Sequence, residues 1–489
     1  MYNYLLQKKL SNILIIFIIL FYSVFILFEN NIKIYSLIIA GDVLNESNID
    51  NILFNFKITY LIIFPLFFTF IYFVEKKNFL TSTIVFKLTP FLIFSCWTLN
   101  HFIFSHRSFF FNNHIATHWL FSYFDFGFIK RGLAGTVMEV FGKNIKNNFY
   151  YIFFISNLIF LILTYLILST WNLLKNNKYL IFFFLIIITS PSTISFFLSD
   201  VGRFDQINYI VFMLLFFHLL KYRNNYNFYY VVLLNIFAAL IHEGYFLLQF
   251  PIFFSFLIFL YIEKCKFNHF NLKIFFKLSF VLLIMIFSAI VIYKFGYVKN
   301  FDLIKIKNYF IEISNFKVIE ESPIETYNKN IFHFGIMLSK PYKTFFADSH
   351  YSTFILSITY FLIFLPCIAT LSYLWINILK ACKSLKHYIL NIFLLISSFI
   401  PFFIGAFLLG FIDHYRFFSS IILLNFICFL FSYSIIKSKI KFNKYIFNII
   451  NVFFIIFLLY NVILNTFFAP LEKNALLFSK LIYYVSKLF

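Results

Sequence analysis

Apolar stretches of about 20 residues recur along almost the whole chain, and this repetition constrains the fold more than any other feature. An α-helix rises about 1.5 Å per residue, so such a stretch crosses a hydrocarbon core of roughly 30 Å. The stretches do not alternate apolar and polar residues as the strands of an outer-membrane barrel do. With 62% hydrophobic and 12% charged residues, a water-soluble domain of this length could not cover its own surface. The sequence therefore predicts an all-α, polytopic transmembrane helical bundle.

The hydropathy pattern predicts about thirteen spans within a single integral membrane domain over residues 1–489. They are expected at 11–28, 52–74, 84–104, 149–170, 179–198, 206–220, 228–241, 245–262, 274–293, 352–378, 388–411, 416–436 and 446–467. Two longer segments are too polar to cross a bilayer. Residues 105–148 are expected to form an outer interfacial or re-entrant segment, and residues 294–350 a large outer loop. Residues 471–489 fit either an outer helix or a final short span.

The distribution of lysine predicts the orientation in the membrane. With Lys8 and Lys9 on the cytoplasmic side, alternate connections are basic and the short connections between them hold few bases. The basic connections include Lys76 and Lys77, Lys175 and Lys178, Lys221 and Arg223, 264–277, 380–386 and 437–444. This bias places the N-terminus in the cytoplasm. All eight aspartates then lie on the outer side, together with His242 and Glu243, so the chemistry is expected at the outer leaflet.

Arginine is rare in this chain, with only five among forty basic residues. Arg107, Arg131, Arg203 and Arg416 each lie at the edge of an apolar stretch. The planar guanidinium binds phosphate and carboxylate through two parallel hydrogen bonds, which lysine cannot match. The arginines therefore indicate recognition of phosphate or carboxylate at a membrane surface. The alternative is chance survival of a few arginine codons, followed by local ion pairing.

The first candidate motif is the segment 124–135, which holds one acid, two adjacent bases and three of the eleven glycines. Glycine lets the backbone approach a ligand closely or turn with positive φ. Glycines around a pair of cations are typical of an anion-binding cradle. The candidate residues are Asp125, Gly127, Lys130, Arg131 and Gly132. The alternative is an interfacial aromatic segment whose bases contact lipid headgroups.

The second motif, residues 199–205, lies between two predicted spans. Asp200 and Asp205 flank Arg203, next to Gly202. Two acids beside an arginine can bind a divalent cation, act as a general base, or pair internally. Ionised groups at the mouth of a membrane bundle usually line a functional cavity. A solvated, ion-paired turn is the alternative.

Two further motifs have similar positions at the ends of spans. His242 and Glu243 form a candidate proton-transfer pair near the low-dielectric edge of the bilayer. They are not a zinc motif, because HExxH requires a second histidine where this chain has Phe246. Asp413 and Arg416 repeat the spacing of acid and arginine seen in the second motif. Capping of a helix by His242 and a local Asp413–Arg416 salt bridge are the alternatives.

Other classes of function find no support in the sequence. It contains no Walker loop and no glycine-rich dinucleotide turn, which argues against an ATP-driven pump. The five cysteines form no CxxC pair and no metal-ligand spacing, so they are expected to pack as small apolar residues. We therefore expect no cofactor, no bound metal and no nucleic-acid partner. Whether the second motif binds a divalent cation is left open by the sequence.

The chain resembles bacterial O-antigen and capsular polysaccharide polymerases. It also resembles the wider GT-C-type membrane glycosyltransferases. The resemblance rests on its many spans, its basic and very aromatic composition, its outward Asp/Arg clusters and its large outer loop. The resemblance implies an enzyme of the bacterial cytoplasmic (inner) membrane that polymerises polyprenyl-diphosphate-linked repeat units at the outer leaflet. A GT-C-type transferase using a polyprenyl-phosphate sugar donor is the first alternative. The implied partners are the lipid-linked glycan, the bilayer, and a chain-length regulator or a flippase.

The resemblance also implies roles for the candidate residues. Lys130, Arg131, Arg203 and Arg416 would bind the (di)phosphate. The catalytic acids or bases would be Asp125 or Asp200, then Glu243 with His242. Gly127, Gly132, Gly202, Asp205 and Asp413 would support them. A transporter for the same lipid-linked glycan is a second alternative, although transporters usually carry ionisable residues near the middle of spans. A purely structural membrane scaffold is the third.

Overall fold

The computed structural model describes residues 113–436 and residue 440, with several gaps. The gaps are 175–176, 189, 191, 194–195, 198–200, 224–225, 265–271, 317, 329–352 and 402–413. Contacts divide the chain into two units, one made of residues 1–107 and 443–489 and the other of residues 108–442. Every described residue belongs to the second unit. The predicted spans before residue 105 and at 446–467 lie outside the described residues, as do residues 471–489.

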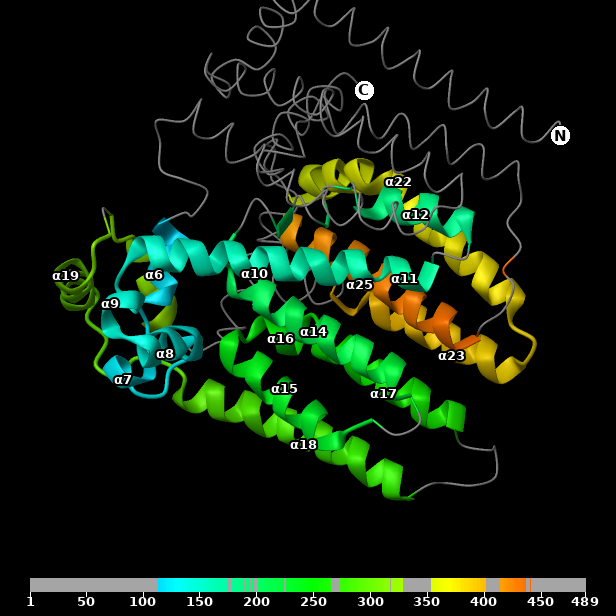
Figure 1. The fold of residues 1–489 in the computed structure, drawn as a ribbon, viewed down its shortest axis with the longest axis horizontal. Coiled ribbons are helices and arrows are strands. Elements are labelled where there is room, and N and C mark those ends of the chain that lie inside the picture. The colour runs from blue at the N-terminus through cyan, green and yellow to red at the C-terminus, as the bar shows by residue number, and fades with distance from the viewer. Residues whose placement is uncertain are drawn as a thin grey trace, which may run out of the picture. The chain divides into compact units, whose positions relative to one another are not determined.

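The described residues form helices and no strand (Figure 1). Five helical segments are long and apolar enough to cross a membrane: Phe149–Leu174, Phe204–Lys221, Ile274–Phe295, Tyr360–Ala381 and Phe418–Ile435. They belong to α10 (Phe149–Ser169) with α11 (Trp171–Leu174), α14 (Phe204–Lys221), α18 (Leu272–Phe295), α22 (Thr353–Ala381) and α25 (His414–Ile436). All-helical, membrane-type architecture is thereby confirmed, while the count of thirteen spans and the orientation stay predictions.

Shorter helices complete the bundle: α12 (Lys178–Ile188), α15 (Phe228–Ile241), α16 (Gly244–Leu247), α17 (Phe250–Lys264) and α23 (Leu385–Ser398). Neighbours along the chain pack together, as α14 does with α15, and α23 packs against both α17 and α25. The predicted span at 245–262 is divided into α16 and α17. Pro251 stands in the first turn of α17, where its missing N–H is tolerated, so a new helix begins there.

The polar segments predicted outside the membrane fold into short helices at one end of this unit (Figure 1, left). The helices are α6 (Asn113–Trp119), α7 (Tyr123–Phe126), α8 (Gly132–Phe141), α9 (Lys143–Lys146), α19 (Leu303–Ile313), α20 (Glu321–Glu325) and the 3-10 turn η3 (Thr326–Asn328). The ring of Phe121 stacks on Tyr327 at 3.6 Å and meets Phe310 edge-on at 4.9 Å. The segments 113–148 and 296–328 therefore share one core.

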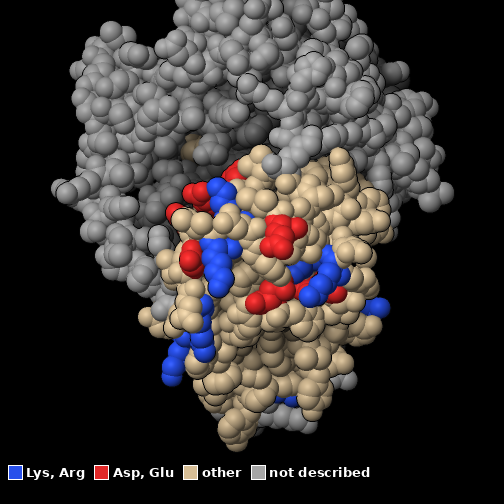
Figure 2. All heavy atoms as spheres, turned by 90° about the vertical axis from the view of Figure 1, so that its left-hand side faces the viewer, with Lys and Arg blue, Asp and Glu red and all other residues tan. Residues whose placement is uncertain are grey.

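Charged side chains of both signs gather on the outer face of this end, while most of the surrounding described surface is uncharged (Figure 2). One exposed pair on it joins Lys307 Nζ to Glu321 Oε1 at 2.6 Å. Charge concentrated at the end of an apolar bundle is typical of a part that meets water or headgroups rather than hydrocarbon. We call this part, residues 113–148 and 296–328, the polar end.

Gly135 is required by close packing inside the polar end. A Cβ atom there would lie 2.1 Å from the carbonyl oxygen of Phe121 and 2.7 Å from that of Trp119. Since both obstacles are backbone, Gly135→Ala is expected to lower the free energy of unfolding by about 1–3 kcal/mol. Thermal unfolding of the purified chain in detergent measures the loss. Val140→Ala, at an exposed position of the same helix α8, is the control, and equal melting temperatures for the two variants would contradict the prediction.

Candidate functional site

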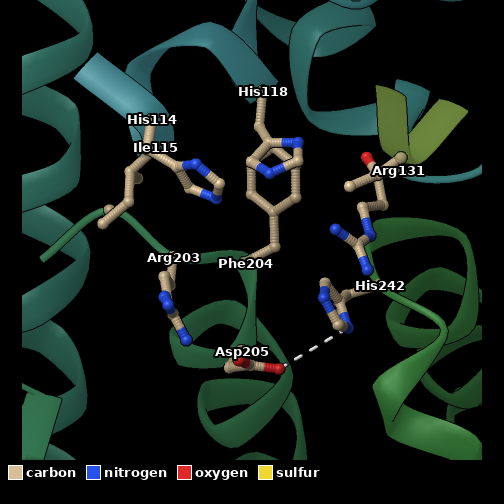
Figure 3. A pocket seen from close by; sticks show the side chains of 10 residues that line it. His114, Ile115, His118, Arg131, Arg203, Phe204, Asp205 and His242 are labelled. Atoms are coloured by element: carbon tan, nitrogen blue, oxygen red, sulfur yellow. Dashed lines mark ion pairs between the residues drawn. The ribbon is translucent and has the colours of Figure 1, made fainter. Parts of the chain in front are cut away.

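A cavity of about 100 Å³ opens where the polar end meets the bundle (Figure 3). It is lined by His114, Ile115, His118, Arg131, Gly202, Arg203, Phe204, Asp205, His242 and Thr326. One water needs about 10–15 Å³ of such space, so the cavity holds several waters or one phosphate-sized group, but not a chain of sugars. Figure 3 shows Arg131 and Arg203 on opposite sides of it, with His242 beneath Arg131 and Asp205 at the foot of the view between the two sides. The first three sequence motifs therefore meet in one place.

The ion pair between Arg131 and Glu243 joins two of these motifs across 112 residues. Arg131 Nε donates to Glu243 Oε1 at 3.0 Å and to Oε2 at 2.8 Å, and Nη2 donates to Oε1. Arg131 has a φ of 60°, a left-handed conformation that is unusual for a side chain of this size. Strained backbone of this kind collects at ligand-binding sites and is held there by surrounding contacts. Here the carboxylate of Glu243 supplies one of those contacts.

Both partners of this pair are charged at neutral pH. Burial alone would raise the pKa of Glu243, but the positive charge of Arg131 outweighs burial and holds that pKa well below its usual value. The hydrogen bonds use Nε and Nη2 of the guanidinium, so Nη1 is the nitrogen left for a ligand in the cavity. Glu243 therefore orients Arg131 and does not itself line the cavity.

Asp205 and His242 form the second acid–base contact of the site. Asp205 is buried in the first turn of α14, and its Oδ1 lies 3.5 Å from His242 Nδ1. The backbone N–H of Gly244 donates to the same Nδ1 at 2.9 Å, so the neutral ring carries its proton on Nε2. Burial, reinforced by the charge of Arg131, lowers the pKa of His242, which is therefore neutral at pH 7.

Gly244 makes this contact possible by having no side chain. A Cβ atom there would lie 2.7 Å from His242 Nδ1 and 3.4 Å from Asp205 Oδ1. In the sequence H-E-G at 242–244, the backbone N–H of Gly244 therefore holds the imidazole of His242 with its Nδ1 facing Asp205. The carboxylate of Asp205 lies at the N-terminus of α14, where the helix dipole favours a negative charge.

Arg203 approaches the cavity from the turn that precedes α14. Gly202 has a φ of 89°, which an L-residue adopts only with strain, and Arg203 follows as the N-cap residue. The carbonyl of Gly202 accepts a hydrogen bond of 3.0 Å from the indole Nε1 of Trp119 on α6. The turn is thereby fixed to the polar end, which brings Arg203 opposite Arg131.

Two histidines of the site were not among the sequence candidates. His114 and His118 are four residues apart on α6 and therefore share one helix face. His118 Nδ1 lies 3.2 Å from the hydroxyl of Tyr327, and His114 Nδ1 lies 3.5 Å from Glu320 Oε2. Burial lowers the pKa of both imidazoles. The i, i+4 spacing of the two histidines in N-H-I-A-T-H indicates that they share a helix face. No local pattern in the sequence indicates that this face lies near Arg131.

Asp125, Gly127, Lys130 and Gly132 do not line the cavity. Asp125 instead accepts hydrogen bonds from Lys146 Nζ and, at 3.1 Å, from the hydroxyl of Tyr309. Burial opposes ionisation, but the hydrogen bond and charge of Lys146 lower the pKa of Asp125. A carboxylate held in this way is a weak proton acceptor. The predicted role of Asp125 as the base therefore finds no support in its position.

The glycines and Lys130 of the first motif shape the turn that carries Arg131. Gly127, with a φ of 70°, ends α7, and a Cβ atom on Gly132 would lie 2.6 Å from the Tyr123 ring. The backbone N–H of Lys130 donates to the carbonyl of Gly296 at 2.9 Å. The motif thus positions one arginine, rather than cradling an anion with all its members.

Three remaining candidates are not placed by the described residues. Asp200 and Asp413 lie outside them, and Arg416 stands in the first turn of α25 with its side chain outside them. Among the described residues, no group of three or more His, Cys, Asp or Glu could hold a metal ion. The expectation of no cofactor, and the open question of a divalent cation, stay as predicted from the sequence.

Comparison with protein-family models, with curated proteins and with solved structures found no match to this chain. The class of protein therefore follows from the fold and the cavity alone. It is a helical, membrane-type protein with two arginines, a buried acid and three histidines converging at the polar end of its bundle.

Proposed function

We propose that this chain is a membrane glycosyltransferase that polymerises polyprenyl-diphosphate-linked oligosaccharide repeat units at the outer leaflet of a bacterial cytoplasmic membrane. The observation that supports the proposal is the convergence of Arg131, Arg203 and the Asp205–His242 contact in one cavity at the end of apolar helices. A lipid-linked sugar carries its phosphate at headgroup level, and two guanidinium groups on opposite sides of a phosphate-sized cavity suit it.

In the proposed reaction, the arginines bind the phosphate that leaves with the lipid. The bond between the glycosidic carbon and the phosphate oxygen breaks, and the negative charge that develops on that oxygen is stabilised by Arg131 and Arg203. The acceptor hydroxyl attacks the same carbon and gives its proton to the carboxylate of Asp205. The neutral His242 carries no proton on Nδ1, the nitrogen that lies nearest Asp205, so the ring does not compete for the carboxylate and Asp205 is left as the base.

Two other functions use the same cavity. A GT-C-type transferase with a polyprenyl-phosphate donor needs the same arginines and base, and the cavity's size suits its single phosphate. A lipid-linked glycan transporter is less well supported, because the ionisable side chains of the described site lie at helix ends and not in mid-helix.

The test is the gel profile of surface polysaccharide from cells lacking the gene, complemented with the wild type, Arg203→Lys, Asp205→Asn or Glu312→Gln. Glu312 is exposed on α19, so Glu312→Gln is the matched acid-to-amide control. Deletion, Arg203→Lys and Asp205→Asn are expected to remove the long-chain ladder and keep a single repeat unit, while Glu312→Gln restores the ladder.

Two other outcomes would redirect the assignment. Loss of one sugar or branch with chain length retained would favour the GT-C-type transferase over the polymerase. An unchanged glycan in the deletion strain would contradict both enzymes.

A further inference from the structure

At the opposite end of the bundle, where α22 ends and α23 begins (Figure 1, right), three connections are rich in basic residues. We call the described parts of these connections, residues 221–223, 226–227, 263–264, 272–277 and 380–386, the basic end. Arg223 Nε donates to Glu263 Oε2 at 3.2 Å, and Lys386 Nζ donates to the backbone carbonyl of Glu263 at 3.0 Å. Glu263 therefore joins the connection after α14, the end of α17 and the start of α23.

The basic end has a large excess of positive charge. Its described side chains include seven Lys or Arg residues and one acid, Glu263. Lys264 is close enough to Arg223 and Lys277 to interact with the charges of both. One carboxylate, already bound to Arg223, cannot neutralise this group, so an anion from outside the chain would be bound favourably.

Large apolar side chains are exposed directly beside these cations. Tyr229, Leu272, Phe276 and Leu385 stand in the first turns of α15, α18 and α23 and are 60–78% exposed. Lys277 Nζ also lies 5.6 Å from the centre of the Phe228 ring. A free inorganic anion would make no use of these side chains, whereas a molecule with an anionic head and long apolar tails would contact both.

We propose that the basic end binds an anionic phospholipid, with the phosphate among Arg223, Lys264 and Lys277 and the acyl chains along Leu272 and Phe276, which lie four residues apart on α18. Basic pockets between membrane helices bind anionic headgroups in this way, and each lysine near the surface raises the affinity about fivefold. These connections are also those predicted to face the cytoplasm, where anionic lipid is concentrated.

Native mass spectrometry of the full chain, titrated in detergent with phosphatidylglycerol or with phosphatidylcholine, tests the proposal. The wild type is expected to retain phosphatidylglycerol preferentially and to lose it as ionic strength rises. Lys264→Gln/Lys277→Gln is expected to bind it roughly 30-fold more weakly, since two charges are removed. Lys299→Gln/Lys305→Gln, which removes two exposed lysines from the polar end, is the matched control and is expected to bind as the wild type does.

Equal retention of the two lipids by the wild type would overturn the proposal, and so would equal losses in the two double variants. The salt dependence and the lipid preference are measured on the wild type. These two measurements can therefore refute the proposal even if a variant folds poorly.

Discussion

Arg131→Gln is expected to lower polymer formation by two to three orders of magnitude, about the effect of removing one donor that stabilises developing charge. The same change leaves the carboxylate of Glu243 largely buried without its cation, at a cost of about 3–5 kcal/mol of folding free energy. Turnover of lipid-linked substrate in membrane vesicles measures the first effect. Thermal unfolding in detergent measures the second.

The charge exchange Arg131→Glu/Glu243→Arg separates these two effects. The exchanged pair restores opposite charges at both positions, so much of the stability is expected to return. Activity is not expected to return, because the guanidinium then approaches the cavity from residue 243. Recovery of activity in the exchanged variant would show that Arg131 acts only through the ion pair, and full activity of Arg131→Gln would show that the reaction does not need Arg131.

Lys146→Met is expected to be the most destabilising change in the polar end. The side chain of Lys146 is 1% exposed and lies between the carboxylates of Asp125 and Glu139, with its Nζ 2.8 Å from Glu139 Oε2. Without the ammonium group two buried carboxylates face each other, which costs about 3–5 kcal/mol. Lys143→Met, on the same helix with a side chain 74% exposed, is the control and is expected to change stability by less than about 0.5 kcal/mol.

The pH dependence of this destabilisation has a defined sign. The pKa of Asp125 is lowered in the folded protein, so its pair with Lys146 stabilises the fold above the unfolded pKa of about 3.9 and loses that effect as pH falls through the folded pKa. The gap in melting temperature between wild type and Lys146→Met is therefore expected to persist from pH 7 down to about pH 4 and to narrow below that pH. A gap independent of pH, or no gap at pH 7, would contradict this account. Asp125→Asn/Glu139→Gln/Lys146→Met, which leaves no buried charge in the cluster, is expected to recover part of the loss.

The membrane-type helices were predictable because the signal is local. The predicted spans at 206–220, 228–241 and 274–293 coincide with α14, α15 and part of α18. The length of an apolar segment is enough to predict a membrane-spanning helix, because in a bilayer every backbone N–H and C=O group must be hydrogen-bonded within the helix. The division at 245–262 could also have been read from Pro251. The packing of segment 113–148 against segment 296–328 could not be predicted from the sequence, since it depends on the stacking of Phe121 on Tyr327, two residues far apart in sequence.

For the site, the sequence by itself determined which residue types carry the chemistry: rare arginines, acids and a histidine at the ends of apolar helices. Only the tertiary structure decided their partners. It joined Arg131 to Glu243 and Asp205 to His242, and it held Asp125 with Lys146 and away from the cavity. The physical reason is that composition and apolar length act over a single helix. The strength of a charge pair instead depends on distance and burial, which are set by contacts between remote segments.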